Sequence, residues 1–470
     1  MPKNSNHNDQ IKAGRVISVQ GPVVDVKFDS VDDVPNVFNL IKVQTIDQLD
    51  VYLEVAEHIP GNVARCISIN STQNIQRNAK AIPTGGSIEV PVGDEVYSRV
   101  INVLGQPYDQ KEPIKAKKVM PIRSQNISTK VRSKSIGKTK FEVLETGIKI
   151  IDLLFPLVKG SKTGVLGGAG LGKSVITLEI IHNITTKHQG TCVFVGIGER
   201  IREGNELYFE LSSHGILNKT MVVFGQMNEP PGARYGVAMT GATLAEDLQK
   251  QNKDVLLFVD NIFRFIQAGA EISTLLGRVP SETGYQPTLI SEASEFHERI
   301  RSGEGMAGSV TAIEAVYVPA DDMTDPAVVA IFTFLDSLMV LSRERVALGL
   351  YPAIDPLQSS CANLDPDIVG SRHYQVSQEV LRVFYKYEEL RRLVLVIGID
   401  ELSPADRLIY DRARKLQNFL TQPFSVAEAY TGRKGFYVEI EQTIRGCEDI
   451  IAGRFDKKPE EEFYMIGPLS

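Results

Sequence analysis

The eight residues from Gly167 to Ser174, GGAGLGKS, have the types and spacing needed to hold a phosphate group. They fit the pattern G-x-x-x-x-G-K-[ST], with the apolar run GVL before them and the helical pattern KSVITLEIIHNI after them. Glycines let the backbone wrap closely around phosphate oxygens, and the N-terminus of the following helix offers free N–H groups. Lys173 would neutralise phosphate charge, and the Ser174 hydroxyl would bind Mg²⁺. The pattern therefore predicts a phosphate-binding loop rather than a glycine-rich turn without a ligand.

A second GKT sequence, in SIGKTK from Ser135 to Lys140, does not qualify as such a loop. Arg132 stands where the pattern requires its first glycine, and no apolar strand precedes the segment. We therefore expect one phosphate loop in the chain.

Two acidic residues at strand ends could complete a nucleotide site. VLLFVD ends in Asp260 after five apolar residues, and CVFVGIGER ends in Glu199 and Arg200. Parallel sheets bind ligands at the carboxyl ends of their strands. Asp260 could therefore hold the water shell of a magnesium ion, and Glu199 could polarise the attacking water. By spacing alone, a surface ion pair within ERIREGNE explains Glu199 and Arg200 at least as well.

The elements that must position these residues divide the chain into parts. From Ile11 to about Val92, short β-branched runs separated by turn residues predict a small barrel or sandwich. From about Phe141 to Asp367, apolar strands alternate with helical stretches, which predicts a parallel sheet with helices on both faces. After Gly370 the pattern becomes helical. The basic connector between the first two parts, about 111–140, is expected to be extended surface chain.

The expected fold class is therefore a multidomain α/β protein. Its expected parts are a flexible tail (1–11), a β-barrel domain (12–92), a P-loop nucleotide-binding domain with a parallel sheet (93–368) and a C-terminal helical domain (369–470).

Composition excludes several other classes. The net charge of −7 gives no case for nucleic-acid binding. The four cysteines (Cys66, Cys192, Cys361 and Cys447) are far apart, so neither a zinc cluster nor a disulfide framework is indicated. The start, MPKNSNHNDQ, has the character of neither a signal peptide nor a transit peptide, and we expect no targeting peptide. The longest apolar stretch, from Ala327, is broken by Asp336, so any membrane contact is expected to come through partners.

Many motifs in one order closely resemble the catalytic beta subunits of F-type rotary ATP synthases. The resemblance runs from about Gly14 to the C-terminus. It rests on GGAGLGKS, GERIREGNELY, LLFVDNIFRFIQAGAEISTLLGR, GYQPTL, YVPADDMTDPA, GLYPAIDPL, FLTQPFSVAEAYTG and FYMIGP.

This resemblance implies a role for each matching residue. The implied catalytic residues are Lys173, Glu199, Arg200 and Arg264, and those near Mg²⁺ are Ser174, Glu203 and Asp260. The implied nucleotide contacts are Gly167, Gly168, Ala169, Gly170, Leu171, Gly172, Lys173, Ser174 and Val175, with Tyr351, Phe424, Ala427 and Tyr430 around adenine. Flat side chains suit a purine because they add stacking to buried area. Without the resemblance, ordinary core packing would be the better interpretation of the three aromatic residues.

The resemblance also implies partners. The related non-catalytic alpha subunit carries Gln where this chain has Glu199, so the chain is of the catalytic type. An arginine from a neighbouring alpha-type subunit is expected to complete the site, in an alternating hexameric ring around a gamma-type central shaft. The implied location is the cytoplasmic face, or the stromal face if the chain is plastid-encoded, of an energy-transducing membrane.

Three segments depart from the family pattern. SSCAN places Cys361 and Ala362 where the family has a segment ending in arginine, and DELSPAD places Pro404 and Ala405 where the family has acids. SEASEFHERI is also unusual. These differences leave open a divergent motor that only hydrolyses ATP and is coupled to a different ion or load.

Two rivals come from other classes. One is a homohexameric export ATPase, for which Arg372 is the candidate catalytic arginine. The other is an RNA-tracking hexameric helicase, which the acidic balance and the C-terminal helices disfavour.

Overall fold

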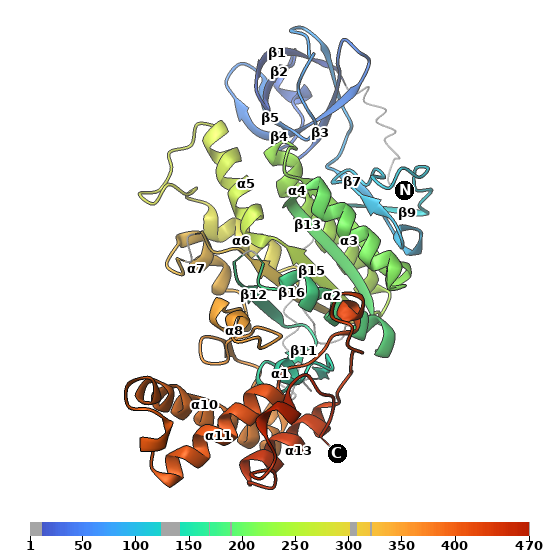
Figure 1. Cartoon of the computed structure of the whole chain (residues 1–470). Helices are drawn as coiled ribbons and strands as arrows, with labels where there is room; N and C mark the ends of the chain where they lie inside the picture. The colour runs from blue at the N-terminus through green and yellow to red at the C-terminus, as the bar shows by residue number, and fades with distance from the viewer. Residues whose placement is uncertain are drawn as a thin grey trace, which may run out of the picture.

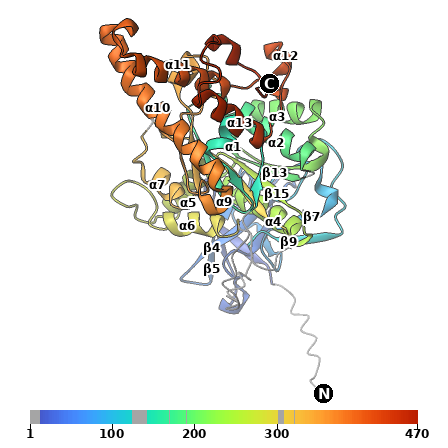
Figure 2. The ribbon, with the colours of Figure 1, turned by 90° about the horizontal axis from the view of Figure 1, so that it is seen from below.

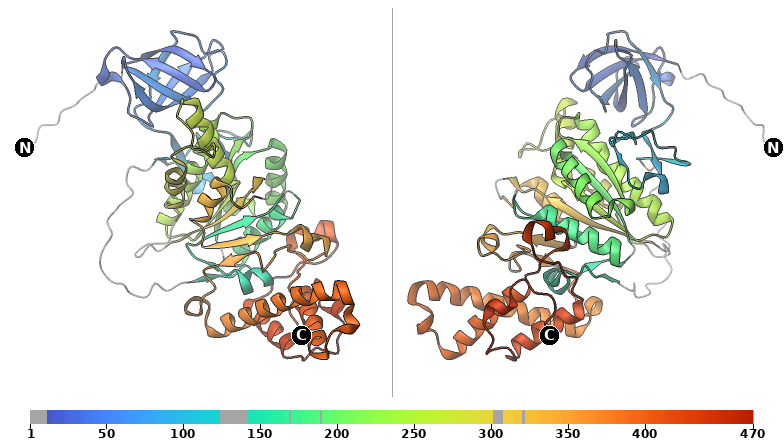
Figure 3. Two further views of the ribbon diagram at one scale, coloured as in Figure 1. Left: turned by 90° about the vertical axis from the view of Figure 1, so that its left-hand side faces the viewer. Right: turned by 45° about the vertical axis from the view of Figure 1, so that its right-hand side comes forward.

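The computed structural model describes residues 12–123, 142–168, 170–188, 190–300, 308–319 and 322–469. A β-barrel lies at one end of the molecule and a helical domain at the other, with a sheet covered by helices between them (Figure 1). The views in Figure 3 show the same three-part arrangement from two other sides. The expected fold class is therefore confirmed.

The N-terminal barrel is closed, with the strand order β1-β2-β5-β4-β3-β6. Alternate residues of its strands fill the interior; Val16, Val26 and Leu53 are fully buried there. The barrel strands are β1 (Gly14–Gln20), β2 (Val23–Lys27), β3 (Leu40–Gln44), β4 (Asp50–Ile59), β5 (Val63–Ser68) and β6 (Lys80–Pro83).

The barrel ends earlier than the sequence indicated. Strand β7 (Glu89–Val92) falls inside the expected segment 12–92, but it pairs with β9 (Lys118–Pro121) in a separate two-stranded sheet. Strand β9 belongs to the connector that was expected to be extended surface chain, and its residues are mostly exposed. Residues 124–140 of that connector lie outside the described residues.

The central sheet has eight strands in the order β18-β17-β12-β16-β15-β13-β14-β8. The predicted parallel pairing is found between all neighbours except β17 and β18, which are antiparallel. After β17 the chain turns back and β18 runs in the opposite direction beside it. This antiparallel connection needs no crossover to the other end of the sheet. The strands are β8 (Val100–Ile101), β12 (Lys162–Leu166), β13 (Thr191–Glu199), β14 (Thr220–Gln226), β15 (Val255–Asp260), β16 (Val310–Val316), β17 (Ser337–Val340) and β18 (Ser360–Cys361).

Helices cover both faces of this sheet, as predicted. Along β13, Val193 and Val195 belong to one apolar cluster and Cys192 and Phe194 to another, because successive side chains of a strand point to opposite faces. The first cluster includes α4 (Pro231–Lys250), α5 (Ile262–Leu275), α6 (Leu289–His297) and α7 (Pro326–Phe332). The second includes α1 (Lys149–Leu154), α2 (Lys173–Lys187) and part of α3 (Ile201–Ser213), with β10 (Val143–Leu144) and β11 (Leu157–Val158) beside them.

The helices of the C-terminal domain follow Gly370, and among the described residues after it no strand is found. That glycine has a φ of 88°, which a residue with a side chain rarely adopts, and it precedes the long helix α10. Helices α10 and α11 pack side by side (Figure 2). The remaining helices are α8 (Arg343–Ala347), α9 (Pro366–Val369), α10 (Ser371–Ile397), α11 (Pro404–Phe419), α12 (Glu428–Thr431) and α13 (Ile440–Ile451). Across the described ranges, none of the helices has the length and apolar character needed to cross a bilayer.

Candidate functional site

The glycine loop joins the end of β12 to the start of α2. Gly170 and Gly172 have φ values of 79° and 88°, where a side chain would be strained. Helix α2 begins at Lys173, so its first N–H groups face the loop. Ala169 lies outside the described residues.

Lys173 folds back onto this loop. Its Nζ donates a hydrogen bond of 2.7 Å to the carbonyl oxygen of Gly167. Burial lowers the pKa of Lys173, and the charges of Asp260 and Glu199 only partly oppose that shift. The ammonium group is therefore held close to two carboxyl groups in a setting where burial disfavours its charged form.

The predicted acids surround a cavity of about 150 Å³ beside the loop, which Ser174 also lines. Glu199 ends β13 and Asp260 ends the adjacent β15, with Gly196 paired to Asp260 in the parallel register. Glu203 reaches the same cavity from the first turn of α3. The structure thus brings together the predicted residues at the strand ends and those at the start of α2.

The pKa values of these acids are displaced upward. Burial, then the charge of Asp260, then the contact with Glu203 raise the pKa of Glu199, although Arg264 opposes the shift. Burial also raises the pKa of Asp260; Lys173 opposes this and Glu203 adds to it. The cavity therefore disfavours the charged forms of both acids, and a cation bound beside them would favour those forms.

The two predicted arginines lie at the edge of this cluster. Arg264, on α5, packs its side chain against Gly198, where an added Cβ would lie 3.5 Å from the arginine carbons. Arg200 directly precedes α3, and its Nη1 is 3.8 Å from Glu203 Oε1 at the exposed surface. A surface ion pair thus exists in ERIREGNE, but it uses Glu203, whereas Glu199 lines the cavity.

The residues expected around adenine are only partly gathered. The backbone N–H of Gln422 donates to the carbonyl of Tyr351 at 3.0 Å, which holds the segment before Phe424 beside Tyr351. The backbone N–H of Val426 donates to Glu179 of α2 at 3.0 Å, which fixes Phe424 and Ala427 near the phosphate-loop helix.

The exposure of the three rings differs. Phe424 is 6% exposed and belongs to the apolar core, as ordinary packing would predict. Tyr351 is 40% and Tyr430 is 83% exposed, and Val175 of α2 is 39% exposed. Within the described residues, no ring contact joins the three aromatic side chains.

Sequence reasoning missed several residues that line the site cavity. Glu206 and Glu210 follow Glu203 on the same face of α3, and Thr177 follows Ser174 on α2. Their helical spacing of three or four residues is the signal that could have found them. The apolar side of the cavity is formed by Phe194, Leu207, Phe224 and Phe258.

The donor atoms of the site fit magnesium. Ser174, Glu203 and Asp260 offer only oxygen atoms, which Mg²⁺ prefers, and Mg²⁺ is usually bound by one or two carboxylates together with phosphates and waters. In the ranges that the structure describes, no group of three or more His, Cys, Asp or Glu is arranged to hold a metal ion. The site therefore suits a magnesium ion that shares its ligands with a nucleotide.

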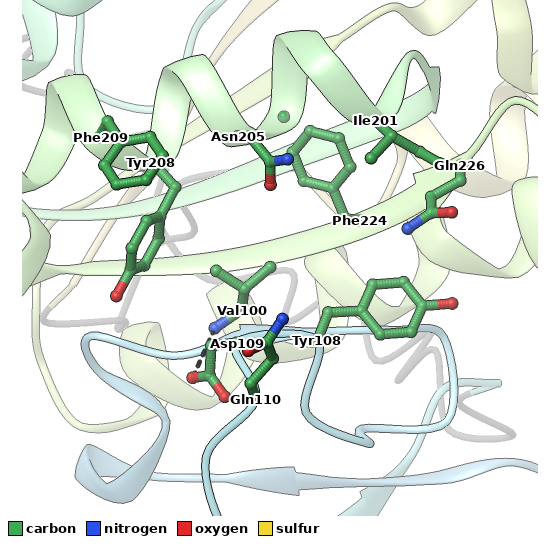
Figure 4. A pocket seen from close by; sticks show the side chains of 11 residues that line it. Val100, Tyr108, Asp109, Gln110, Ile201, Asn205, Tyr208, Phe209, Phe224 and Gln226 are labelled. Atoms are coloured by element: carbon green, nitrogen blue, oxygen red, sulfur yellow. Dashed lines mark hydrogen bonds between the residues drawn. The ribbon is translucent and has the colours of Figure 1, made fainter.

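A larger cavity of about 300 Å³ lies on a different face of α3 (Figure 4). Tyr108 and Asp109 line it from the loop after β8, and Asn205 and Tyr208 line it from α3. None of the predicted site residues lines this cavity. Size alone would therefore have indicated a different site from the one that the sequence predicts.

A glycine loop between a central parallel strand and a helix, with acids at neighbouring strand ends, defines a P-loop nucleotide-binding protein. Comparison with family models then places the chain more closely. Residues 147–361 match the nucleotide-binding domain of the ATP synthase alpha/beta family, and residues 16–85 match the beta-barrel domain of that family. Together these matches cover more than half of the chain, which belongs to the ATP synthase alpha/beta family.

The C-terminal match is of a different kind. Residues 362–451 match the C-terminal domain of V and A type ATP synthase. The family as a whole indicates a rotary ATPase subunit that works with ATP alongside alpha/beta partners. The finer expectation of an F-type beta subunit goes beyond these matches.

Proposed function

We propose that this chain is the catalytic beta-type subunit of a rotary F-type ATPase. It interconverts ATP and ADP plus phosphate at an interface with an alpha-type subunit, and it couples this reaction to rotation of a gamma-type shaft and to ion transport. The observation that carries the proposal is the carboxyl group of Glu199, which lines one cavity with Ser174 and Asp260 and interacts electrostatically with Lys173.

Each residue has a chemical role in this proposal. The loop N–H groups hold the phosphates, and Lys173 exchanges the carbonyl of Gly167 for a phosphate oxygen. Glu199 orients the water that attacks the terminal phosphate, and Arg264 and Arg200 stabilise the charge that develops there. Ser174, Glu203 and Asp260 would hold Mg²⁺ and its waters. That ion, when bound, neutralises phosphate charge.

Contacts of Arg372 favour the alpha-type partner over the homohexameric alternative, for which Arg372 is the candidate arginine. Arg372 donates to both carboxylate oxygens of Glu448, at 2.9 and 2.7 Å, and to Glu441 at 2.6 Å. Because these bonds use its charge within its own C-terminal domain, Arg372 is poorly placed to complete a neighbour's site. A partner's arginine remains the better source.

The DELSPAD segment, Asp400–Asp406, is the loop that we expect to contact the shaft. Ser403 caps α11 by accepting a hydrogen bond from the N–H of Asp406 at 3.1 Å, and Pro404 occupies the first turn, where proline is tolerated. The substitution of two acids therefore leaves a well-formed helix start. Leu395 and Val396, at the end of α10, are 78% and 83% exposed beside this loop, as a partner surface would require.

A second candidate function follows from the C-terminal match. A V- or A-type rotary ATPase subunit, or a divergent motor that only hydrolyses ATP, would keep the same nucleotide chemistry with another load. Purification from native membranes, with identification of the subunits that accompany the chain, separates these types. The same purification tests the proposed position as a peripheral protein on the cytoplasmic or stromal face, attached through partners.

The catalytic proposal is tested by comparing the purified chain with its reconstituted complex. The chain alone should bind MgATP but hydrolyse it slowly, and an alpha-type partner should raise turnover by about 10³–10⁵-fold, the usual contribution of a catalytic arginine. Replacing that partner's arginine should remove the gain and leave affinity nearly unchanged. Full-speed hydrolysis by the chain alone would contradict the proposal.

A further inference from the structure

The segment after β17 lies directly against the phosphate loop. Strand β17 pairs with β12 in parallel register, and the N–H of Leu341 donates to the carbonyl of Leu166 at 2.8 Å. An added Cβ on Gly167 would lie 2.9 Å from Leu341 Cβ, and one on Gly168 would lie 2.8 Å from Nη2 of Arg343. Two glycines of the loop thus permit this close approach, and they place the Arg343 guanidinium on the loop itself.

Arg343 differs from the other arginines around it in having no charged partner. Arg345, two residues later, lies 3.9 Å from Asp355, and Arg391 of α10 is paired with both Glu344 and Glu388. Over the ranges that the structure describes, Arg343 makes no hydrogen bond or ion pair, and its side chain is exposed. Its five N–H donors are therefore available beside a loop built to hold an anion.

The residue next to Arg343 connects α8 to the C-terminal domain. Glu344 forms its ion pair with Arg391, in the second half of the long helix α10. Ser342 caps α8 by accepting a hydrogen bond from the N–H of Glu344 at 3.2 Å, so Arg343 and Glu344 belong to one fixed turn. A movement of Arg343 toward a ligand would therefore also move the contact with α10.

We propose that Arg343 contacts the phosphates of the bound nucleotide, and that α8 transmits this contact to α10 through Glu344 and Arg391. The inference rests on the proposed function, since it needs a nucleotide in the loop. Arg343 acts on binding and on the coupling between domains, separately from the water-orienting role of Glu199. A guanidinium suits this position because it can bind phosphate oxygens through two parallel hydrogen bonds.

The first test is equilibrium titration of the purified chain with MgATP and with inorganic tripolyphosphate. Arg343→Gln should weaken the affinity for both by about 10- to 100-fold, the usual effect of losing a charge-assisted hydrogen bond. Arg382→Gln is the matched control, because Arg382 is an exposed α10 arginine paired with Glu379 on its own helix, and its affinities should be unchanged. Wild-type affinity in Arg343→Gln, alongside lost binding in Lys173→Ala, would overturn the role of Arg343 and leave the nucleotide site standing.

The second test measures the coupling by hydrogen exchange along α10, with and without saturating MgATP. In the wild-type chain, MgATP should change the protection of amides near Arg391. Arg391→Gln should keep MgATP affinity within about twofold, since Arg391 lies away from the phosphates, but it should lose this change. The same change in protection in Arg391→Gln as in the wild type would overturn the transmission through α8.

Discussion

Two groups of buried charges in the central domain contrast sharply. In the site cavity, Glu199, Glu203 and Asp260 lie together, with the charges of Lys173 and Arg264 close by, and the pKa values of Glu199 and Asp260 are raised. Where α6 packs on β16, His297 of α6 and Glu314 of β16 are both fully buried, with Nε2 of His297 3.0 Å from a carboxylate oxygen of Glu314. The first group crowds several acids around one cavity, whereas the second is a single His–Glu pair closed off from solvent.

The geometry of the closed pair suits a charged histidine. Nδ1 of His297 is 2.7 Å from the carbonyl oxygen of Ala293, so both ring nitrogens face acceptors. Both nitrogens can donate only when the ring is an imidazolium. Phe334 stacks on the ring with centroids 4.9 Å apart, which closes the pair off from solvent.

The two groups therefore have different roles: the His297–Glu314 pair stabilises the fold, and the acids of the site cavity serve the proposed binding and catalysis. A buried charge that already has its partner fixes α6 against β16, and removing one member costs stability. A cluster of acids crowded into one cavity costs stability as it stands, and a bound cation offsets part of that cost. We therefore expect substitutions in the two groups to have opposite consequences.

The largest expected effect on stability is at the closed pair. Glu314→Ala leaves a buried imidazolium without its counter-charge, and we expect it to lower the free energy of unfolding by about 3–5 kcal/mol. Urea denaturation followed by circular dichroism measures this. The double variant His297→Gln with Glu314→Gln removes both charges and should recover most of the loss. A single variant as stable as the wild type would mean that the pair does not hold the fold together.

In the site cavity we expect activity, not stability, to fall. Glu199→Gln keeps the side chain's shape and removes a carboxyl group that is costly to bury, so its free energy of unfolding should be equal to or higher than that of the wild type. Turnover of MgATP in the assembled complex should fall at least ~10²-fold, the lower end of acid–base assistance. Binding of MgATP should persist. Unchanged turnover would mean that Glu199 has no catalytic role.

The pH dependence of stability should report the closed pair. Burial lowers the pKa of His297, but the charge and hydrogen bond of Glu314 and the Ala293 carbonyl outweigh it, so the pKa is raised overall; Lys162 is the facing cation that opposes them. The stabilisation is therefore complete below the unfolded pKa of about 6.5 and is lost as pH rises through the folded pKa. Its size is about 1.4 kcal/mol for each tenfold difference in proton affinity between the folded and the unfolded chain. Unfolding curves at a series of pH values measure this loss. The double variant should lack it, and an equal loss in that variant would assign it to other groups.

The smallest effect is expected at the edge of the site. Tyr351→Ala removes an exposed ring that can stack on adenine, and it should weaken MgATP binding about tenfold, equivalent to ~1–1.5 kcal/mol. Fluorescence titration with ATP and with tripolyphosphate separates the base from the phosphates. An equal loss for tripolyphosphate would exclude stacking on the base.

Local sequence patterns predicted that the glycine loop, Glu199 and Asp260 lie close together. GGAGLGKS is contiguous, and Glu199 and Asp260 end strands that meet at one edge of a parallel sheet, so their proximity follows from the sheet alone. The pairing of His297 with Glu314 could not be predicted in this way. The two residues come together only when α6 packs on β16, and the sequence marked SEASEFHERI only as unusual.

The same limit explains the departures in the fold. Strand β7 has the alternation of a barrel strand, but its partner is β9, in a connector with little apolar periodicity. The residue types at Phe424 and Tyr430 are equally aromatic, and only tertiary packing decides that one is buried and the other exposed. Pairing partners and burial depend on contacts that no local pattern contains.

The central claim is that the acid-lined cavity beside the glycine loop is a nucleotide site. The most direct test is the stability that the chain gains when MgATP is added. At a ligand concentration 100 times its Kd, the purified wild-type chain should gain about 2.7 kcal/mol in free energy of unfolding. Lys173→Ala should fold normally but gain almost nothing, because the ammonium group beside Asp260 and Glu199 is lost. No gain in the wild-type chain, or an equal gain in Lys173→Ala, would contradict the account.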